Sequence, residues 1–383
     1  VTRAGGSLAY GEWAAKRVKS KRGSQVATAV LGVLIFIDDY FNCLTVGTVM
    51  RPITDRFKIS RAKLAYIIDA TAAPVCILAP VSSWAAAVGS SLPEGSELDG
   101  FSLFLQTIPF NLYAWMTVLF MLFIIWSQRD VFAMAKYVKR NQEHFIVPEE
   151  YRDSEEAHVE GNGKIIDLVL PLLVLIGACV YGMLYTGGIN EGASIQQAFA
   201  DCDSSKSLVF GSFIAFVFTA LLYLPRRVIT FSSFCETFAQ GFKAMTPANL
   251  ILCFAWTLSG ICSDKYLNLG GYVGNLVSAN VDVLVFLPAI FFLVAIVLAF
   301  ATGTSWGTFG ILIPIAIAVI GNGDPSLLVL TVAAVLSGAV GGDHASPISD
   351  TTILASAGAQ CSHIDHVNTQ IPYVAMVSTA SFM

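Results

Sequence analysis

The sequence predicts an all-α polytopic membrane protein with two inverted-topology repeats, discontinuous helices and re-entrant hairpins. Hydrophobic residues make up 55% of the 383-residue chain, charged residues only 13%, and the mean hydropathy is +0.68. Soluble domains carry about 25% charged residues, so this composition is typical of a protein embedded in lipid. Long uncharged windows alternate with clusters of charge, and acidic and hydroxyl side chains that a lipid-facing helix does not carry lie at the ends of apolar runs, as in "GGDHASPISDTT" (341–352).

The uncharged windows are the expected membrane spans. A helix that crosses the hydrocarbon needs roughly 20 apolar residues, and most of the windows approach or exceed that length: 70–93, 100–128, 207–225, 244–263, 283–323 and 325–342. Transmembrane β-strands alternate apolar and polar residues, whereas "WMTVLFMLFIIW" (115–126) is apolar on every face. The spans are therefore predicted to be helices. The chain opens at Val1 without a signal peptide and stops at Met383 inside an apolar run, so we expect an internal piece of a longer protein, with helices missing at one or both ends.

Composition also disfavours some classes of site. The cysteines form no C-x-x-C pair and most lie in apolar runs. This pattern is typical of small buried residues and not of a disulfide framework or a transition-metal centre. No nucleic-acid partner is expected for a membrane chain with a net charge of −5.

The distribution of charge predicts the orientation. The basic connecting segments are 16–22, 51–63, 129–140 and 226–227, and the acidic ones are 92–100 and 189–203. By the positive-inside rule the basic set is cytoplasmic and the acidic set external. Segment 24–50 then has basic flanks on both sides, so it is predicted to be a re-entrant hairpin or a pair of half-helices around "IDDYFN" (37–42). The alternative, that one flank is an exception to a statistical rule, remains open.

The remaining elements follow in order. Residues 64–90 are predicted to run outward, 102–127 to return, and 128–164 to form a charged cytoplasmic connection with a surface helix and a loop. This connection separates an N-terminal transmembrane repeat (1–127) from a C-terminal one (165–383). The second repeat is expected to contain an interfacial helix at 228–245 and spans at 165–187, 207–225, 247–263 and 283–320. The last span is too long for one helix, and "ATGTSWGT" (301–308) predicts an unwound turn inside it.

Internal similarity supports two repeats. At an offset near 304 residues Asp39 falls on Asp343, and at an offset of 298 Thr71 falls on Thr369. Each half then has an acidic helix break followed by a T-x-x-P helix. Chance agreement of small residues is the alternative, because the identity is thin. Inverted repeats with interrupted helices place their binding site at the breaks, so the breaks are the predicted location of the site.

Buried acidic and hydroxyl side chains define the candidate site. An ionised Asp at the centre of a membrane helix costs about 2.5–3.5 kcal/mol, so such residues face the protein interior and have a function. Their oxygens are hard ligands, suited to a small monovalent cation such as Na⁺ and also able to take a proton. The predicted ion- and proton-binding residues are Asp38, Asp39, Asn42, Asp343, His344, Ser346, Ser349, Asp350 and Thr351, with Asp39 and Asp343 as the Na⁺ ligands. The predicted substrate-binding residues are Asp69, Thr71, Thr304, Ser305, Trp306 and Thr369.

Structural alternatives stay open at several of these positions. Asp39 or Asp343 would also serve as a helix cap, and "SPISD" (346–350) as a helix start with Ser346 as N-cap. Asp69 could alternatively pair with a basic residue, and His344 could donate a hydrogen bond to a backbone carbonyl. Outside the predicted site, the alternative for Trp84 is an anchor at the membrane interface. We interpret "SHIDH" (362–366) as a connecting loop and not as a metal-binding pair of histidines.

Three stretches carry a resemblance to a known family. "FIDDYFNCLTVGT" (36–48), "GTSWGTFGILIP" (303–314) and "GGDHASPISDTT" (341–352) are similar to the NhaC family of Na⁺/H⁺ antiporters. The resemblance implies a bacterial inner-membrane carrier that exchanges external H⁺ for internal Na⁺, and some members couple ion gradients to an organic anion, as in malate/lactate exchange. It assigns the family motif to Asp38, Asp39, Asn42, Asp343, His344, Ser346, Pro347, Ser349, Asp350, Thr351 and Thr352. The opening and closing helices of the family have no counterpart here.

We therefore expect a multi-pass secondary transporter and not an enzyme, with Na⁺ and H⁺ as transported ions, no cofactor and membrane lipid around it. The alternative is a Na⁺- or H⁺-coupled carrier of a small organic anion, such as a carboxylate, or an amino acid. No Arg or Lys falls inside the apolar windows, which favours cation exchange over an anionic cargo. A homodimer is one expected assembly.

Overall fold

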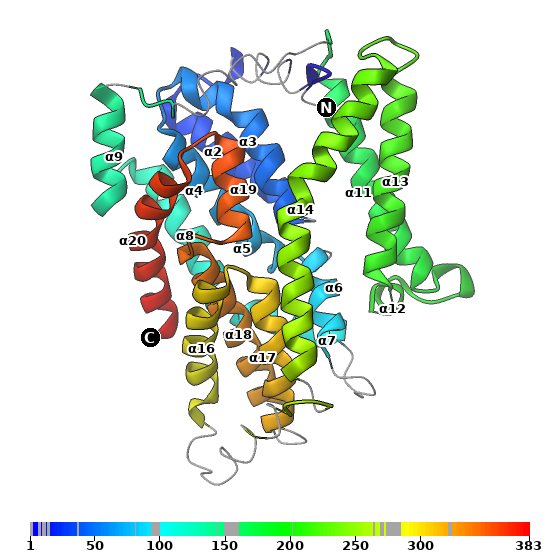
Figure 1. Ribbon diagram of the computed structural model, residues 1–383, viewed down its shortest axis with the longest axis vertical. Helices are drawn as coiled ribbons and strands as arrows, with labels where there is room; N and C mark the ends of the chain where they lie inside the picture. Colours follow the sequence, from blue (N-terminus) through cyan, green and yellow to red (C-terminus); the bar gives the residue numbers. More distant parts are fainter. Residues whose placement is uncertain are drawn as a thin grey trace.

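The computed structural model describes residues 3–6, 9, 13, 16–36, 38–80, 82–92, 100–143, 145–148, 161–200, 202–262, 265–268, 272, 285–320 and 324–383. All regular structure in these ranges is helical, which confirms the predicted all-α class. Figure 1 shows one body of helices from the first and last parts of the chain and, beside it, the hairpin of α11 and α13, with the long α14 between the two.

The helices of the first part are α2 (Lys21–Leu34), α3 (Asp39–Arg56), α4 (Arg61–Thr71), α5 (Ala73–Cys76), α6 (Ser83–Ser90), α7 (Gly100–Thr107), the 3₁₀ turn η1 (Ile108–Phe110), α8 (Leu112–Ser127) and α9 (Phe132–Glu143). Those of the middle part are α11 (Ile166–Thr186), the 3₁₀ turn η3 (Ile189–Glu191), α12 (Ile195–Ala200), α13 (Ser204–Tyr223) and α14 (Phe231–Cys262). Those of the last part are α16 (Leu287–Thr302), α17 (Ser305–Ile320), α18 (Pro325–Ala345), α19 (Asp350–Ala359) and α20 (His363–Phe382).

Helices are interrupted where the sequence places polar residues. The predicted turn inside 283–320 is confirmed, because α16 ends at Thr302 and α17 begins at Ser305. Gly303 between them has a φ of 69°, a left-handed conformation that glycine adopts without strain. Further breaks lie between the end of α2 at Leu34 and the start of α3 at Asp39, and at 346–349 between α18 and α19. At the first, the Asp38 side chain caps α3 by accepting the Phe41 N–H.

Two features of the spans were not predicted. The segment 64–90, which was predicted to run outward, contains a break, because α4 ends at Thr71 and the chain turns at Ala72 before α5. Pro74 follows directly, and a proline is tolerated in the first turn of a helix and not in its interior. The expected interfacial helix at 228–245 and the span at 247–263 are instead one continuous helix, α14, of 32 residues.

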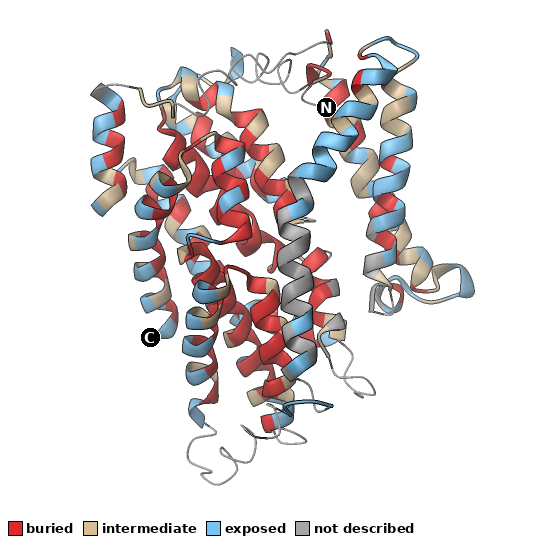
Figure 2. Cartoon of the chain, viewed as in Figure 1, coloured by how far each residue is buried: buried red, intermediate tan, exposed pale blue. Residues whose placement is uncertain are grey.

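The outer surface of the helices is apolar. Among the described residues, three helical segments are long and apolar enough to cross a membrane: Leu112–Gln142, Ile166–Thr186 and Pro325–Ala345. Large exposed side chains on the outer faces include Phe123 on α8 and Val297 on α16, which are 61% and 68% exposed. Figure 2 shows such exposed faces along α13, α16 and α20. Contiguous exposed apolar surface is typical of helices that face lipid, so the chain is a membrane protein.

The connecting segments separate by charge. The basic α3–α4 and α13–α14 turns lie at the upper end in Figure 1, and α12, in the acidic segment 189–203, lies at the lower end of the α11–α13 hairpin. The structure therefore places the basic turns together and away from this acidic segment, as the positive-inside rule requires of one orientation. The other predicted acidic segment, 92–100, lies outside the described residues except for Leu92 and Gly100.

Glycines allow the helices around the breaks to approach closely. α3 packs against α19 where Gly47 faces Gly358, and a Cβ on Gly47 would lie 2.3 Å from the Gly358 carbonyl carbon. α18 packs against α16 in the same way, since a Cβ on Gly342 would lie 2.2 Å from the Ile296 carbonyl oxygen. Small residues at such close helix–helix contacts are typical of membrane proteins, in which helix association depends on close packing.

We expect Gly47→Ala to lower the free energy of unfolding by about 1–3 kcal/mol, because the added methyl group must displace the backbone of α19. Thermal unfolding of the purified protein in detergent measures this change. Gly177→Ala on α11 is the matched control, since no atom lies within 4 Å of a Cβ built there. An unchanged melting temperature for Gly47→Ala would contradict the α3–α19 packing.

Candidate functional site

The helix breaks bring three buried carboxylates together. Asp39 is the first residue of α3, Asp350 is the first residue of α19, and Asp343 lies in the last turn of α18. All three are at most 3% exposed, and they are close enough for their charges to interact. The sequence match of Asp39 to Asp343 joins a helix start to a helix end, whereas Asp350, like Asp39, is the first residue of its helix.

Asp343 lies against the N-terminus of α17. Its Oδ2 accepts the Ser305 hydroxyl at 2.7 Å and the Ser305 N–H at 3.3 Å. Its Oδ1 has no hydrogen-bond partner in the described part of the chain, and the Ser349 hydroxyl lies close to the same carboxylate. Asp343 therefore accepts the first N–H of α17 from the end of another helix and is not the N-cap residue of a helix that it precedes. One buried carboxylate oxygen remains able to bind a ligand.

Tyr40 connects the other two carboxylates. Its hydroxyl donates to Asp350 Oδ2 at 2.6 Å, and its N–H donates to Asp39 Oδ1 at 3.1 Å. Asp39 Oδ2 accepts the Trp84 indole N–H at 3.0 Å, and Asp350 Oδ1 accepts the Thr351 N–H at 2.7 Å. Both carboxylates lie in the first turns of their helices, where the positive end of the helix dipole stabilises a negative charge.

Aromatic rings enclose one side of the carboxylates. The Trp306 ring lies 6.3 Å from Tyr40, 5.9 Å from Trp84 and 6.0 Å from Phe309, measured between ring centroids. The interfacial anchor considered for Trp84 is wrong, because this side chain is fully buried against Asp39. The Trp306 indole N–H is buried without a hydrogen-bond acceptor among the described residues, so a donor faces this region without a partner.

Asn42 connects the break before α3 to the end of α4. Its side-chain amide donates to the carbonyl oxygens of Gly32, Ile35 and Thr71, at 2.7, 3.0 and 3.0 Å. These carbonyls lie where α2 and α4 end, and carbonyls at a helix end lack the i+4 N–H of a continuous helix. The Gly32 oxygen also accepts the Ile35 N–H at 3.1 Å. Asn42 is therefore a structural cross-link in addition to a predicted ion-binding residue.

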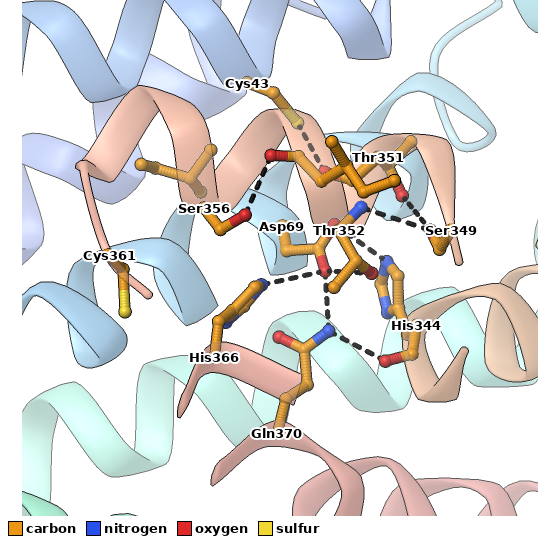
Figure 3. A network of polar contacts seen from close by, with 12 residues as sticks. Cys43, Asp69, His344, Ser349, Thr351, Thr352, Ser356, Cys361, His366 and Gln370 are labelled. Atoms are coloured by element: carbon orange, nitrogen blue, oxygen red, sulfur yellow. Dashed lines mark hydrogen bonds and ion pairs between the residues drawn. The ribbon is translucent and has the colours of Figure 1, made fainter. Parts of the chain in front are cut away.

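A second polar cluster surrounds Asp69 near the end of α4 (Figure 3). Asp69 Oδ2 accepts the Gln370 amide at 2.5 Å and the Thr352 hydroxyl at 3.2 Å. The His344 and His366 rings approach the same carboxylate, with Nε2 to oxygen distances of 3.7 and 3.5 Å. Asp69 is thus partnered by imidazoles and not by the Lys or Arg considered from sequence.

His344 and His366 differ from their expected settings. His344 Nδ1 pairs with the Tyr113 hydroxyl at 3.1 Å and not with a backbone carbonyl. His366 lies in the first turns of α20 and is fully buried, so the interpretation of "SHIDH" as a connecting loop is wrong beyond Ser362. A helix start at His363 brings His366 onto the buried face of α20, which the loop interpretation could not foresee.

The remaining predicted residues form local contacts. Ser349, and not Ser346, is the N-cap of α19, because Ser349 accepts the Thr352 N–H. Ser346 instead ends α18 and donates to the Phe300 carbonyl at 2.8 Å. Hydroxyl groups also bond within their own segments at Thr71, Thr304, Thr351 and Thr369. These residues shape the breaks, and no contact with a substrate follows from their geometry.

Sequence reasoning missed the residues that hold the carboxylates: Tyr40, Trp84, Gln370 and His366. Tyr40 lies inside the "IDDYFN" motif, so its place next to two acidic residues was a usable signal. Gln370 lies four residues after His366, on the same face of a helix. Within the described residues, no three His, Cys, Asp or Glu side chains are grouped to hold a metal ion. Ligands for a small cation at Asp343 therefore have to come also from hydroxyl and backbone oxygens.

Comparison with known proteins gives a consistent set of relatives. The model of a family described as "Na+/H+ antiporter family" matches residues 75–383. An uncharacterised protein of Haemophilus influenzae is 42% identical over 392 residues, which cover 100% of this chain and 74% of that protein. A malate-2H(+)/Na(+)-lactate antiporter of Bacillus subtilis is 32% identical over 43% of this chain and 38% of its own length. An arginine/ornithine antiporter of Halobacterium salinarum is 42% identical over 24% of this chain and 20% of its own length. No solved structure matches.

We expect Asn42→Asp to lower the free energy of unfolding by about 2 kcal/mol or more, because three buried carbonyls lose their donor and face a carboxylate. Thermal unfolding in detergent tests this cross-link. Asn190→Asp is the matched control, since Asn190 is exposed in η3. Equal melting temperatures for the two variants would contradict the role of Asn42.

Proposed function

This chain belongs to the Na⁺/H⁺ antiporter family, and we propose that it exchanges Na⁺ for H⁺ across a bacterial inner membrane by alternating access. Membership in this family supports the more general assignment of the chain as a secondary transporter. The full activity is proposed for the whole protein, because the chain covers 74% of one relative and less than half of each of the other two described.

The proposal that the cargo is a cation rests on one observation. Asp343 is fully buried and one of its carboxylate oxygens has no partner among the described residues. A buried carboxylate is costly unless a cation or a proton compensates its charge. The Ser305 and Ser349 oxygens beside it are hard ligands of the kind that a small cation prefers. We therefore assign Na⁺ to Asp343, with Asp39 and Asp350 completing the negative field around it.

The arrangement of the breaks supports the proposed architecture. α2 and α3 pack side by side around the break between Leu34 and Asp39, and α16 and α17 do so around Gly303. We propose that these pairs are re-entrant hairpins, and that α4–α5 and α18–α19 are discontinuous helices that complete two inverted repeats. The carboxylates at these breaks are buried, so ion entry and exit require the repeats to move relative to each other. The basic turns are assigned to the cytoplasm.

A second candidate cargo is an organic solute. The Trp306 indole N–H is buried without an acceptor in the described region, and a cation cannot satisfy an N–H donor. A carboxylate or another acceptor group on a small molecule would do so. Two relatives are named for organic solutes, malate and lactate in one case and arginine and ornithine in the other. These names favour testing organic acids and amino acids beside Na⁺.

Asp343→Asn and Asp39→Asn are each expected to abolish pH-driven Na⁺ uptake in everted membrane vesicles, because each removes a negative charge from the cation site while keeping its shape. Asp324→Asn is the matched control, since Asp324 is an exposed N-cap of α18 and asparagine caps equally well. Wild-type uptake by either site variant would reject its assigned role. A wild-type protein that moves protons with an organic solute and not with Na⁺ would replace the first candidate by the second.

A further inference from the structure

The Asp69 cluster is separate from the three carboxylates at the cation site. Asp69 on α4 and His366 on α20 are both fully buried, and Asp69 Oδ2 lies 3.5 Å from His366 Nε2. Gln370 holds the carboxylate in place, because its amide donates both to Asp69 and to the His344 carbonyl, the latter at 3.0 Å. Figure 3 shows His366, His344 and Gln370 converging on Asp69.

The cluster is short of hydrogen-bond partners. Asp69 Oδ1 and both ring nitrogens of His366 have none in the described ranges. A neutral imidazole donates only its single N–H to a carboxylate, whereas an imidazolium, which carries a second ring proton, also balances the negative charge. Without that second proton, the Asp69 carboxylate would have only neutral donors around it in the interior of the membrane protein, which is costly.

Within the described residues, no Lys or Arg contacts Asp69 to balance its charge. The titratable groups near the pair are His344 on α18, Tyr113 on α8 beside His344, Cys43 on α3 and Tyr66 on α4. Asp343 on α18 adds a further negative charge that interacts with Asp69. α9, also packed against α20, presents Tyr137, which faces Asp365. The described groups that contact Asp69 therefore include imidazoles and no Lys or Arg, so a proton is the charge that this cluster is built to accept.

We propose that Asp69 and His366 form a proton-carrying site distinct from the cation site at Asp343. The proposal rests on the exchange function above and states where its proton is bound. The proton lies on the His366 imidazole against the Asp69 carboxylate, and it is released to water when α4 and α20 separate. The pair spans both parts of the chain, so its proton strengthens a contact between the first part and the last helix.

The geometry also couples the two sites. An ionised Asp343 adds negative potential at Asp69, which favours a proton on the neighbouring imidazole. A Na⁺ ion bound at Asp343 cancels that potential and so favours release of the proton. By reciprocity the bound proton weakens Na⁺ binding by the same factor. Exchange then follows without both ions competing for one oxygen.

The first test measures how the Na⁺ affinity of the purified protein depends on pH. If one proton leaves for each Na⁺ bound, the apparent dissociation constant for Na⁺ falls about tenfold for each unit by which the pH rises, over the range in which the site titrates. We expect Asp69→Asn and His366→Gln to reduce this dependence to less than about twofold per unit while still binding Na⁺. His363→Gln is the matched control, since His363 lies one turn earlier on α20, partly exposed, and pairs with Ser356 and Pro347. A full dependence on pH in both site variants would overturn the proposal and leave the proton at the acidic cluster.

The second test observes the proton directly. In protein labelled with ¹⁵N-histidine, the His366 signal, assigned by its loss in His366→Gln, is expected to report a charged imidazole that becomes neutral in Asp69→Asn. A neutral His366 at every pH at which the protein is folded would overturn the proposal. A charged His366 in a wild-type protein whose Na⁺ affinity does not change with pH would preserve the proton site and reject Na⁺/H⁺ exchange instead.

Discussion

The structure depends on one constraint: a backbone that leaves the helical conformation inside a membrane must find its hydrogen-bond partners within the protein. The breaks satisfy one another. The Asp350 N–H donates to the Gly303 carbonyl at 3.2 Å and so joins two breaks, and Asn42 joins the break after α2 to the end of α4. The Ser346 hydroxyl closes the end of α16 at Phe300. Each break is therefore stable only because the others are adjacent.

This mutual dependence explains why charged groups collect at the same place. A helix that begins inside the membrane exposes its first N–H groups, and a carboxylate is the strongest acceptor for them. Asp38 at α3, Asp343 at α17 and Asp350 at α19 each accept such an N–H. Capping and ion binding are thus compatible, because a carboxylate has two oxygens and the helix needs only one. Asp343 shows this division most clearly, since Oδ2 serves α17 and Oδ1 remains without a partner in the described chain.

The sequence was sufficient to predict the helical class and the polar break at Gly303, because both depend on local residue type. It was not sufficient for the partners of the carboxylates. Trp84 and Asp39 are 45 residues apart, and Tyr40 and Asp350 are 310 residues apart, so no local pattern relates them. The match of Asp39 to Asp343 does not hold in position, since Asp39 begins α3 whereas Asp343 lies in the last turn of α18. The break at Ala72 was missed because small apolar residues surround it.

The two buried clusters differ in the chemistry of their partners, and this difference argues for separate roles. Asp343 is surrounded by serine oxygens and helix N-termini, which suit a hard cation. Asp69 is surrounded by two imidazoles, which are able to accept a proton, and by an amide donor, with a single hydroxyl as a hard ligand. The clusters are also linked through the backbone, because Asp343 and His344 are neighbours at the end of α18. A movement of that helix end therefore changes both sites at once, which is the condition that obligatory exchange of one ion for the other requires.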